Sequence, residues 1–172
     1  VQTCALPILS AHVHASVSGV VKKIAPYYHP ILGFSETIQI ESDGEDHREE
    51  IMHEQTISPS LPPEEIVSTV KECGIVGLGG ATLPTHVKLS PPKEKPIDIV
   101  IINAAECEPY LTCDHMLMLS KPNEIIKGIQ LIMRAVRATR CIIAIESNKM
   151  DAYELLFSKI RAQHLEKTIC PF

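Results

Sequence analysis

The 172-residue chain has no tryptophan, few other aromatic residues and no long hydrophobic run. A helix that crosses a bilayer needs about 20 consecutive apolar residues, so we expect no direct membrane span and any membrane association to come through a partner. The net charge of −5 gives no basic surface, which argues against a nucleic-acid partner. A hydrophobic content of 45% still suits a globular protein with a sizeable core.

The six cysteines contain no C-x-x-C pair. Zinc sites and iron–sulfur clusters use closely spaced thiolates, so the spacing predicts no metal or cluster ligation within this chain. Scattered cysteines are typical of a reducing compartment, which favours the cytosol. His12 and His14 lie two positions apart on an expected strand, but two ligands are too few for a metal site.

The amino-terminal part reads as a small β module. Residues 11–40 are rich in β-branched residues around an expected turn at Ser18–Gly19, and a polar turn follows near 41–46. A charged, proline-rich stretch comes next and reads as a linker.

Beyond the linker the pattern becomes α/β. Apolar residues between 125 and 136 recur on one broad face of an expected helix. The β-α-β-α order predicts a parallel pair of strands. The expected elements are a helix from Ser60 to Gly74, a strand from Ile97 to Asn103, helices near 114–119 and from Ser120 onward, a strand from Cys141 to Glu146 and a helix from Ala152 to Gln163.

Four glycines crowd into seven residues at Gly74, Gly77, Gly79 and Gly80. Without Cβ atoms, backbone N–H groups can turn toward and closely approach a phosphate or a flat ring. Such a turn is also common as plain structural punctuation, and spacing alone leaves both interpretations open. A Rossmann fingerprint fails because Thr82 takes its last glycine position, and a Walker A loop fails because no Gly-Lys-Ser/Thr follows.

A second polar cluster follows the apolar run at 97–102. It contains Asn103, Glu106, Cys107 and Glu108. Ligands of open α/β sheets bind at the carboxyl ends of the strands, so this loop is a candidate binding segment. Taken alone, its glutamates could equally belong to a solvated loop, and Cys107 to a packed thiol.

Together the two segments carry a specific pattern, GIVGLGG-x-x-x-PTHVKL followed by IIN-x-AECEPY-x-T-x-D-x-ML. It resembles the RnfC subunit of the Rnf ion-translocating electron-transport complex over about residues 62–148. HASVSG and ESDG extend a weaker match toward the amino end. The same motif pair resembles the NADH-binding flavoprotein subunit of respiratory complex I and the cobalamin reductase of bacterial microcompartments.

The resemblance implies a Rossmann-like FMN/NADH-binding α/β domain with a parallel sheet, preceded by a partial barrel-sandwich-hybrid β module. We expect the β module at 1–45, the linker at 46–62 and the amino-terminal part of the FMN/NADH domain at 63–172. The chain reads as incomplete at both ends. The iron–sulfur clusters of the family are expected only outside this chain.

The resemblance also assigns residues to ligands, with no side chain acting as a catalyst because the cofactor carries the chemistry. The residues implied for FMN are Gly77, Gly79, Gly80, Lys88, Asn103 and Glu106, and those for NADH are Ala81 and Glu108.

Three positions depart from the family pattern. Thr82 stands where glycine is usual, and Leu83 stands where an aromatic residue is expected near the dinucleotide. Ala104 replaces a glycine of the second loop, where we expect its methyl group to lie at the ligand. These changes bear on NADH more than on FMN.

The function implied is that of an FMN-dependent subunit passing electrons between NAD(H) and iron–sulfur clusters of a membrane-associated ferredoxin:NAD oxidoreductase complex. Its expected place is the cytoplasmic face of the membrane, together with the other subunits. A cobalamin reductase is the alternative enzyme. A degenerate scaffold, eroded at Thr82, Leu83 and Ala104, is the alternative from another class.

Overall fold

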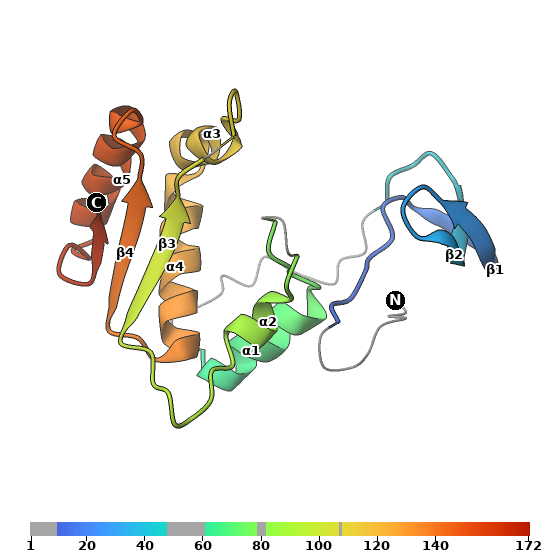
Figure 1. Cartoon of the computed structure of the whole chain (residues 1–172), viewed down its shortest axis with the longest axis horizontal. Helices are drawn as coiled ribbons and strands as arrows, with labels where there is room; N and C mark the ends of the chain where they lie inside the picture. The colour runs from blue at the N-terminus through green and yellow to red at the C-terminus, as the bar shows by residue number, and fades with distance from the viewer. Residues whose placement is uncertain (1–9, 48–60, 79–81, 107) are drawn as a thin grey trace.

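The computed structural model describes residues 10–47, 61–78, 82–106 and 108–172. They form an antiparallel β-hairpin followed by a unit of helices and a parallel sheet (Figure 1). The predicted α/β class with a parallel sheet, preceded by a small β module, is confirmed. The predicted domain boundaries stay predictions, and most of the expected linker lies outside the described residues.

The hairpin joins β1 (Gly19–His29) to β2 (Gly33–Ser42). The turn predicted at Ser18–Gly19 is wrong, because β1 starts there and the chain reverses at 30–32. The ring Nδ1 of His29 accepts the N–H groups of Ile31 and Leu32, both at 3.2 Å, which supplies partners for the amides of the turn. A side-chain acceptor of this kind leaves little trace in the local pattern.

The segment before β1 also differs from expectation. His12 and His14 were placed on a strand, whereas residues 10–18 form no strand in the structure. This segment instead passes so close to Gly74 that a Cβ atom there would overlap the carbonyl oxygen of His12.

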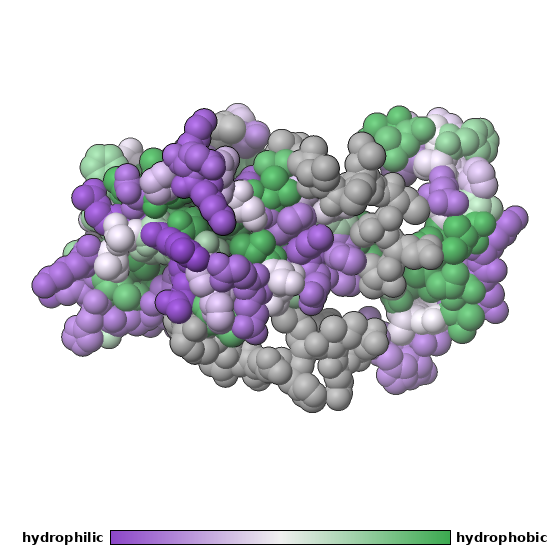
Figure 2. Space-filling model, turned by 90° about the horizontal axis from the view of Figure 1, so that it is seen from below, coloured by the Kyte–Doolittle hydropathy of each residue, from purple (hydrophilic) through white to green (hydrophobic). Residues whose placement is uncertain are grey.

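The hairpin exposes many apolar side chains. Figure 2 shows hydrophobic atoms along the surface of the hairpin, at the right of the molecule. Two strands alone offer no second layer in which such side chains could be buried. The exposed set includes Val20, Ile24, Tyr27, Tyr28, Phe34 and Ile38.

The α/β unit contains five helices and three strands among the described residues. In chain order they are α1 (Pro63–Glu72), α2 (Thr85–Lys88), β3 (Ile99–Ala104), α3 (Cys113–Ser120), α4 (Pro122–Val136), β4 (Arg140–Ile145), α5 (Met150–Ala162) and β5 (Ile169–Pro171).

The start and end of α1 carry residues that are typical of helix ends, which is why the sequence predicted this helix. Pro63 opens α1, where its missing N–H costs nothing, and Glu64 and Glu65 lie in the first turn near the positive end of the helix dipole. Gly74 follows the helix with φ +66°, a left-handed conformation that glycine adopts without strain. The predicted helix is therefore confirmed, although it starts three residues later than expected.

The sheet has the order β3-β4-β5, with all neighbours parallel. The register pairs Ile99 with Arg140 and Ala104 with Ile145, so β3 and β4 end at the same edge. The parallel pair was predicted, whereas the short β5 was not, because three residues carry too little periodicity. The loops after β3 and β4 consequently leave the sheet side by side.

Helices α4 and α5 cover one face of this sheet and enclose the main core (Figure 1). Its most deeply buried members are Ile126, Ile143, Leu156, Ile160 and Ile169. Side chains of the opposite face, including Ile99, Ile101 and Phe172, are exposed in the described part of the chain. No helix within the described ranges is both long and apolar enough to span a membrane.

Candidate functional site

The glycine-rich loop is closed at its base by a short antiparallel bridge. Val76 pairs with Pro84, and the N–H of Gly77 donates to the carbonyl oxygen of Leu83 at 3.0 Å. The expected ligand positions Gly79, Gly80 and Ala81 lie outside the described residues. The bridge between Val76 and Pro84 nevertheless fixes the positions of the two ends of this loop.

Lys88 lies directly against this base. A Cβ atom added at Gly77 would come within 3.1 Å of the Lys88 Nζ atom, so the ammonium group lies close beside the backbone of this glycine. Lys88 is exposed at the end of α2. A cation beside a glycine-rich turn suits a phosphate group, and the residues present thus fit the phosphate end of FMN.

Thr82 has φ +46°, in the left-handed region where a β-branched residue is strained. This conformation gives a physical reason why a glycine is usual at this position. The loop therefore keeps a glycine-like backbone although the residue has changed.

Asn103, near the end of β3, makes the turn into the loop that follows. Its side-chain Oδ1 accepts the N–H of Ala105 at 3.2 Å, and the side chain is exposed. Ala104 differs from expectation, because the residue is only 7% exposed and packs in the core on the helix-covered side. Its methyl group is therefore accommodated by packing. Glu108 is exposed.

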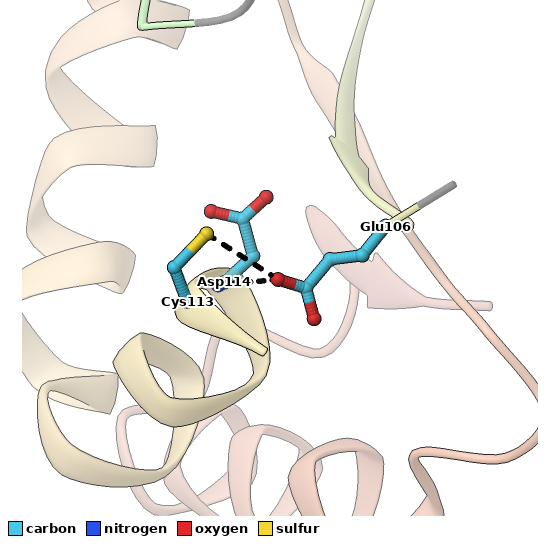
Figure 3. A group of neighbouring side chains, drawn as sticks. All are labelled: Glu106, Cys113 and Asp114. Atoms are coloured by element: carbon cyan, nitrogen blue, oxygen red, sulfur yellow. Dashed lines mark hydrogen bonds between the residues drawn. The ribbon is translucent and has the colours of Figure 1, made fainter. Parts of the chain in front are cut away.

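Glu106 turns inward from this loop, and its side chain is only 4% exposed. Its Oε1 atom accepts the N–H of Asp114 at 2.8 Å and the thiol of Cys113 at 3.4 Å, as Figure 3 shows. Its Oε2 atom accepts the N–H of His115 at 3.4 Å and lies 3.7 Å from Nζ of Lys149. The carboxylate thus caps the amino end of α3, where backbone N–H groups otherwise lack partners.

These contacts shift two pKa values. Burial favours neutral Glu106, but the hydrogen bonds from Asp114, Cys113 and His115 and the charge of Lys149 outweigh it, so the pKa of Glu106 is lowered. The pKa of the Cys113 thiol is raised, first because it donates to Glu106 and also by burial and the charge of Asp114.

Glu106, Cys113 and Asp114 bring three possible metal-ligand atoms within 4.8 Å of one another (Figure 3). A thiol must lose its proton to bind a metal ion, whereas here the thiol proton is held by Glu106. The group is therefore explained by helix capping.

Comparison with known protein families decides the identity of this fold. A model described as the Nuo51 FMN-binding domain matches residues 70–170. The chain belongs to this family. The model of the RnfC barrel sandwich hybrid domain matches residues 3–45, which covers the hairpin. The resemblance to the RnfC subunit of the Rnf complex and the partial barrel-sandwich module are confirmed.

Curated relatives point the same way. The chain is 42% identical over 148 residues to a subunit of the proton-translocating ferredoxin:NAD(+) oxidoreductase complex of Clostridium ljungdahlii, covering 86% of this chain and 32% of that protein. It is 43% identical over 161 residues to a subunit of the Na(+)-translocating ferredoxin:NAD(+) oxidoreductase complex of Acetobacterium woodii, covering 88% and 34%. The chain thus spans about a third of the length of these two relatives.

Among solved structures, an NAD⁺-reducing [NiFe]-hydrogenase in the air-oxidized state matches with a TM-score of 0.54 and 25% identity. The match covers 64% of this chain and 20% of the hydrogenase chain. The H₂-reduced form matches with a TM-score of 0.57 and 23% identity over 66% and 22% of the two chains, which supports the fold.

The described residues of this Nuo51-type domain form two groups. Gly77, at the base of the glycine-rich loop, and Lys88, at the end of α2, form the first, while Asn103, near the end of β3, and Glu106 and Glu108, in the loop that follows, form the second. Figure 1 shows α2 and the connection from α1 that leads into it set apart from the upper end of β3. The expected roles of these residues toward FMN and NADH stay predictions.

Sequence reasoning missed two participants at the sheet edge, Lys149 and the ion pair of His115 with Asp151. His115 Nε2 lies 2.8 Å from Asp151 Oδ1, at the amino end of α5. The predicted parallel pairing could have located them, because the residues just after β4 lie at the same edge of the sheet as those just after β3.

Proposed function

We propose that this chain is part of an RnfC-type subunit that binds FMN and passes electrons between NAD(H) and iron–sulfur clusters lying outside this chain. The observation that carries the proposal is the Lys88 ammonium group placed against Gly77 at the base of the glycine-rich loop. Membership of the Nuo51 FMN-binding domain family supports the choice of FMN over other phosphorylated ligands.

FMN, when bound, would supply a carrier that exchanges a hydride with nicotinamide and single electrons with clusters. The chain contributes binding and orientation. In this proposal Lys88 offsets phosphate charge and Gly77, Gly79 and Gly80 let the backbone approach. Asn103 and Glu106 would hydrogen-bond the flavin and its polyol. Ala81 and Glu108 would face the NADH.

The names of the relatives support a setting in a multi-subunit, ion-translocating ferredoxin:NAD oxidoreductase complex. We infer that the chain docks on other subunits at the cytoplasmic face of a membrane. The strained threonine at position 82 is the observation that favours the degenerate scaffold instead. The cobalamin reductase stays an alternative that partner identification would separate.

The test is a titration of the full-length protein with FMN, followed by the fluorescence of the flavin. Lys88→Met is expected to weaken binding about tenfold, or ~1.4 kcal/mol, because it removes the cation. Gly77→Ala should weaken binding less, because the flexible Lys88 side chain can move aside for the added Cβ atom. Lys127→Met, at an exposed lysine of α4, is the matched control and should bind as the wild type does.

Addition of NADH then tests electron transfer. Bleaching of the bound flavin supports the oxidoreductase, and binding without bleaching separates FMN binding from NADH binding, with Thr82 and Leu83 as the first suspects. A folded protein that takes up no FMN would contradict the proposal and favour the scaffold.

A further inference from the structure

The connection between β4 and α5 reaches the loop after β3 through an ion pair shielded from water. Lys149 and Glu106 have side chains only 13% and 4% exposed, with Nζ and Oε2 3.7 Å apart. Every other ion pair among the described residues has at least one side chain more than half exposed. A shielded pair is costly to break, because the remaining charge loses its partner.

A second link joins the same two regions. His115 donates its backbone N–H to Glu106 and pairs through its ring with Asp151, in the first turn of α5. Asp151 in turn has a lowered pKa, first because of the bond to His115 and then because of the N–H of Ala152. The start of α3 is thus held from both sides, by Glu106 and by α5.

Asn103, near the end of β3, and Glu108, in the loop that follows, are exposed, whereas the side chain of Glu106 between them is only 4% exposed and is held by α3 and Lys149. The exposed residues depend on the backbone between 103 and 108 for their position. Glu106 is the point at which the described part of this loop is anchored to α3 and to Lys149.

We propose that Lys149 is a positioning residue of the candidate FMN site, which acts through Glu106 to hold the loop after β3 in its ligand-binding position. The inference rests on the proposed function, since it assigns Lys149 to the same site. Lys149 touches no ligand in this account. Its effect on binding passes entirely through the carboxylate of Glu106.

The experiment is a double-mutant cycle of FMN affinity in the full-length protein, with Lys149→Met and Glu106→Gln. Each single variant is expected to weaken FMN binding about tenfold, and the double variant hardly more than either one, because both changes remove the same contact. Lys149→Arg, which keeps the charge, should bind within about threefold of the wild type. Lys127→Met serves as the exposed-lysine control.

Hydrogen exchange supplies a readout that needs no flavin. Lys149→Met should speed exchange of the Asp114 and His115 amides, which Glu106 accepts, and leave the amides of α4 unchanged. Additive losses in the cycle, or a Lys149→Met variant that binds FMN as the wild type does, would overturn the inference while the proposed function stands. Failure of the wild type itself to bind FMN would instead sink the proposed function, and the inference with it.

Discussion

At the scale of single residues, two side chains with little solvent exposure differ in whether their polar atoms have hydrogen-bond partners. Glu106 is surrounded by donors that compensate for its burial. His86, on α2, is only 8% exposed, and its Nδ1 atom has no hydrogen-bond partner in the described part of the chain. An unpaired buried polar atom is costly. Since His86 can also take up a proton, we expect the pH to change the free energy of unfolding at this residue.

The pKa of His86 is lowered below its ordinary value of 6.5, first by burial and then by the charges of Lys71 and His12. The folded protein therefore binds this proton less readily than the unfolded chain does. The sign follows from linkage: the free energy of unfolding should be highest above pH 6.5 and decrease as the pH drops below that value.

His86→Leu removes the titrating group and should flatten this pH dependence. Urea unfolding at several pH values between about 7.5 and 5.5 measures the effect, and His47→Leu, at an exposed histidine, is the control. Equal pH slopes for wild type and His86→Leu would contradict the prediction.

At the scale of elements, α4 connects the two parts of the core. Ile126, Ile129 and Met133 pack with the sheet and α5, whereas Ala135 packs with Ile66 of α1 in a second cluster. The 3.6-residue period predicted the apolar face of α4. It could not predict that the face is shared between two partners, because periodicity carries no information about what lies opposite.

Ile129 is 2% exposed and lies at the centre of this face. Ile129→Ala should lower the free energy of unfolding by about 2–5 kcal/mol, because it deletes buried methylene groups and leaves a cavity. Lys127→Ala, on the exposed side of the same helix, should change it by less than about 0.5 kcal/mol. Chemical denaturation of both variants tests this, and a similar loss in both would show that α4 does not organise the core.

The sequence predicted some helices and strands better than others. Helices α1 and α4 and strands β3 and β4 are long or bounded by prolines and glycines, and the sequence predicted them. The hairpin turn was misplaced because its amides are held by the ring of His29. The strand β5 exists only because a three-residue segment finds a partner in β4.

At the scale of the whole molecule, the segment before the hairpin meets the α/β unit at Gly74. This glycine has φ +66°, and a Cβ atom there would overlap the carbonyl oxygen of His12. The contact joins positions far apart in the sequence, next to the buried His86, whose pKa is also lowered by the charge of His12. Gly74 therefore has two roles. It takes the left-handed conformation that follows α1, and its missing side chain leaves room for the amino-terminal segment.

Gly74→Ala should be destabilising for both reasons. The left-handed conformation alone costs about 1–2 kcal/mol, and the overlap must in addition displace the segment around His12. Gly44→Ala is the matched control, because Gly44 has φ +77° with open space around its Cβ position.

Denaturation should show a larger loss of the free energy of unfolding for Gly74→Ala than for Gly44→Ala. If both variants lost the same free energy of unfolding, backbone strain would account for the whole effect and the contact with His12 would contribute nothing.

The sequence by itself determined the family, the α/β class and the two loops that matter, because motifs, caps and apolar periods are local properties of the chain. The tertiary structure decided which carboxylate faces inward, since the donors around Glu106 come from α3 and from Lys149, far along the chain. It likewise decided that Lys88 lies against Gly77 and that Ala104 packs into the core. Distances between residues remote in sequence depend on how helices and strands pack, and no local pattern records them.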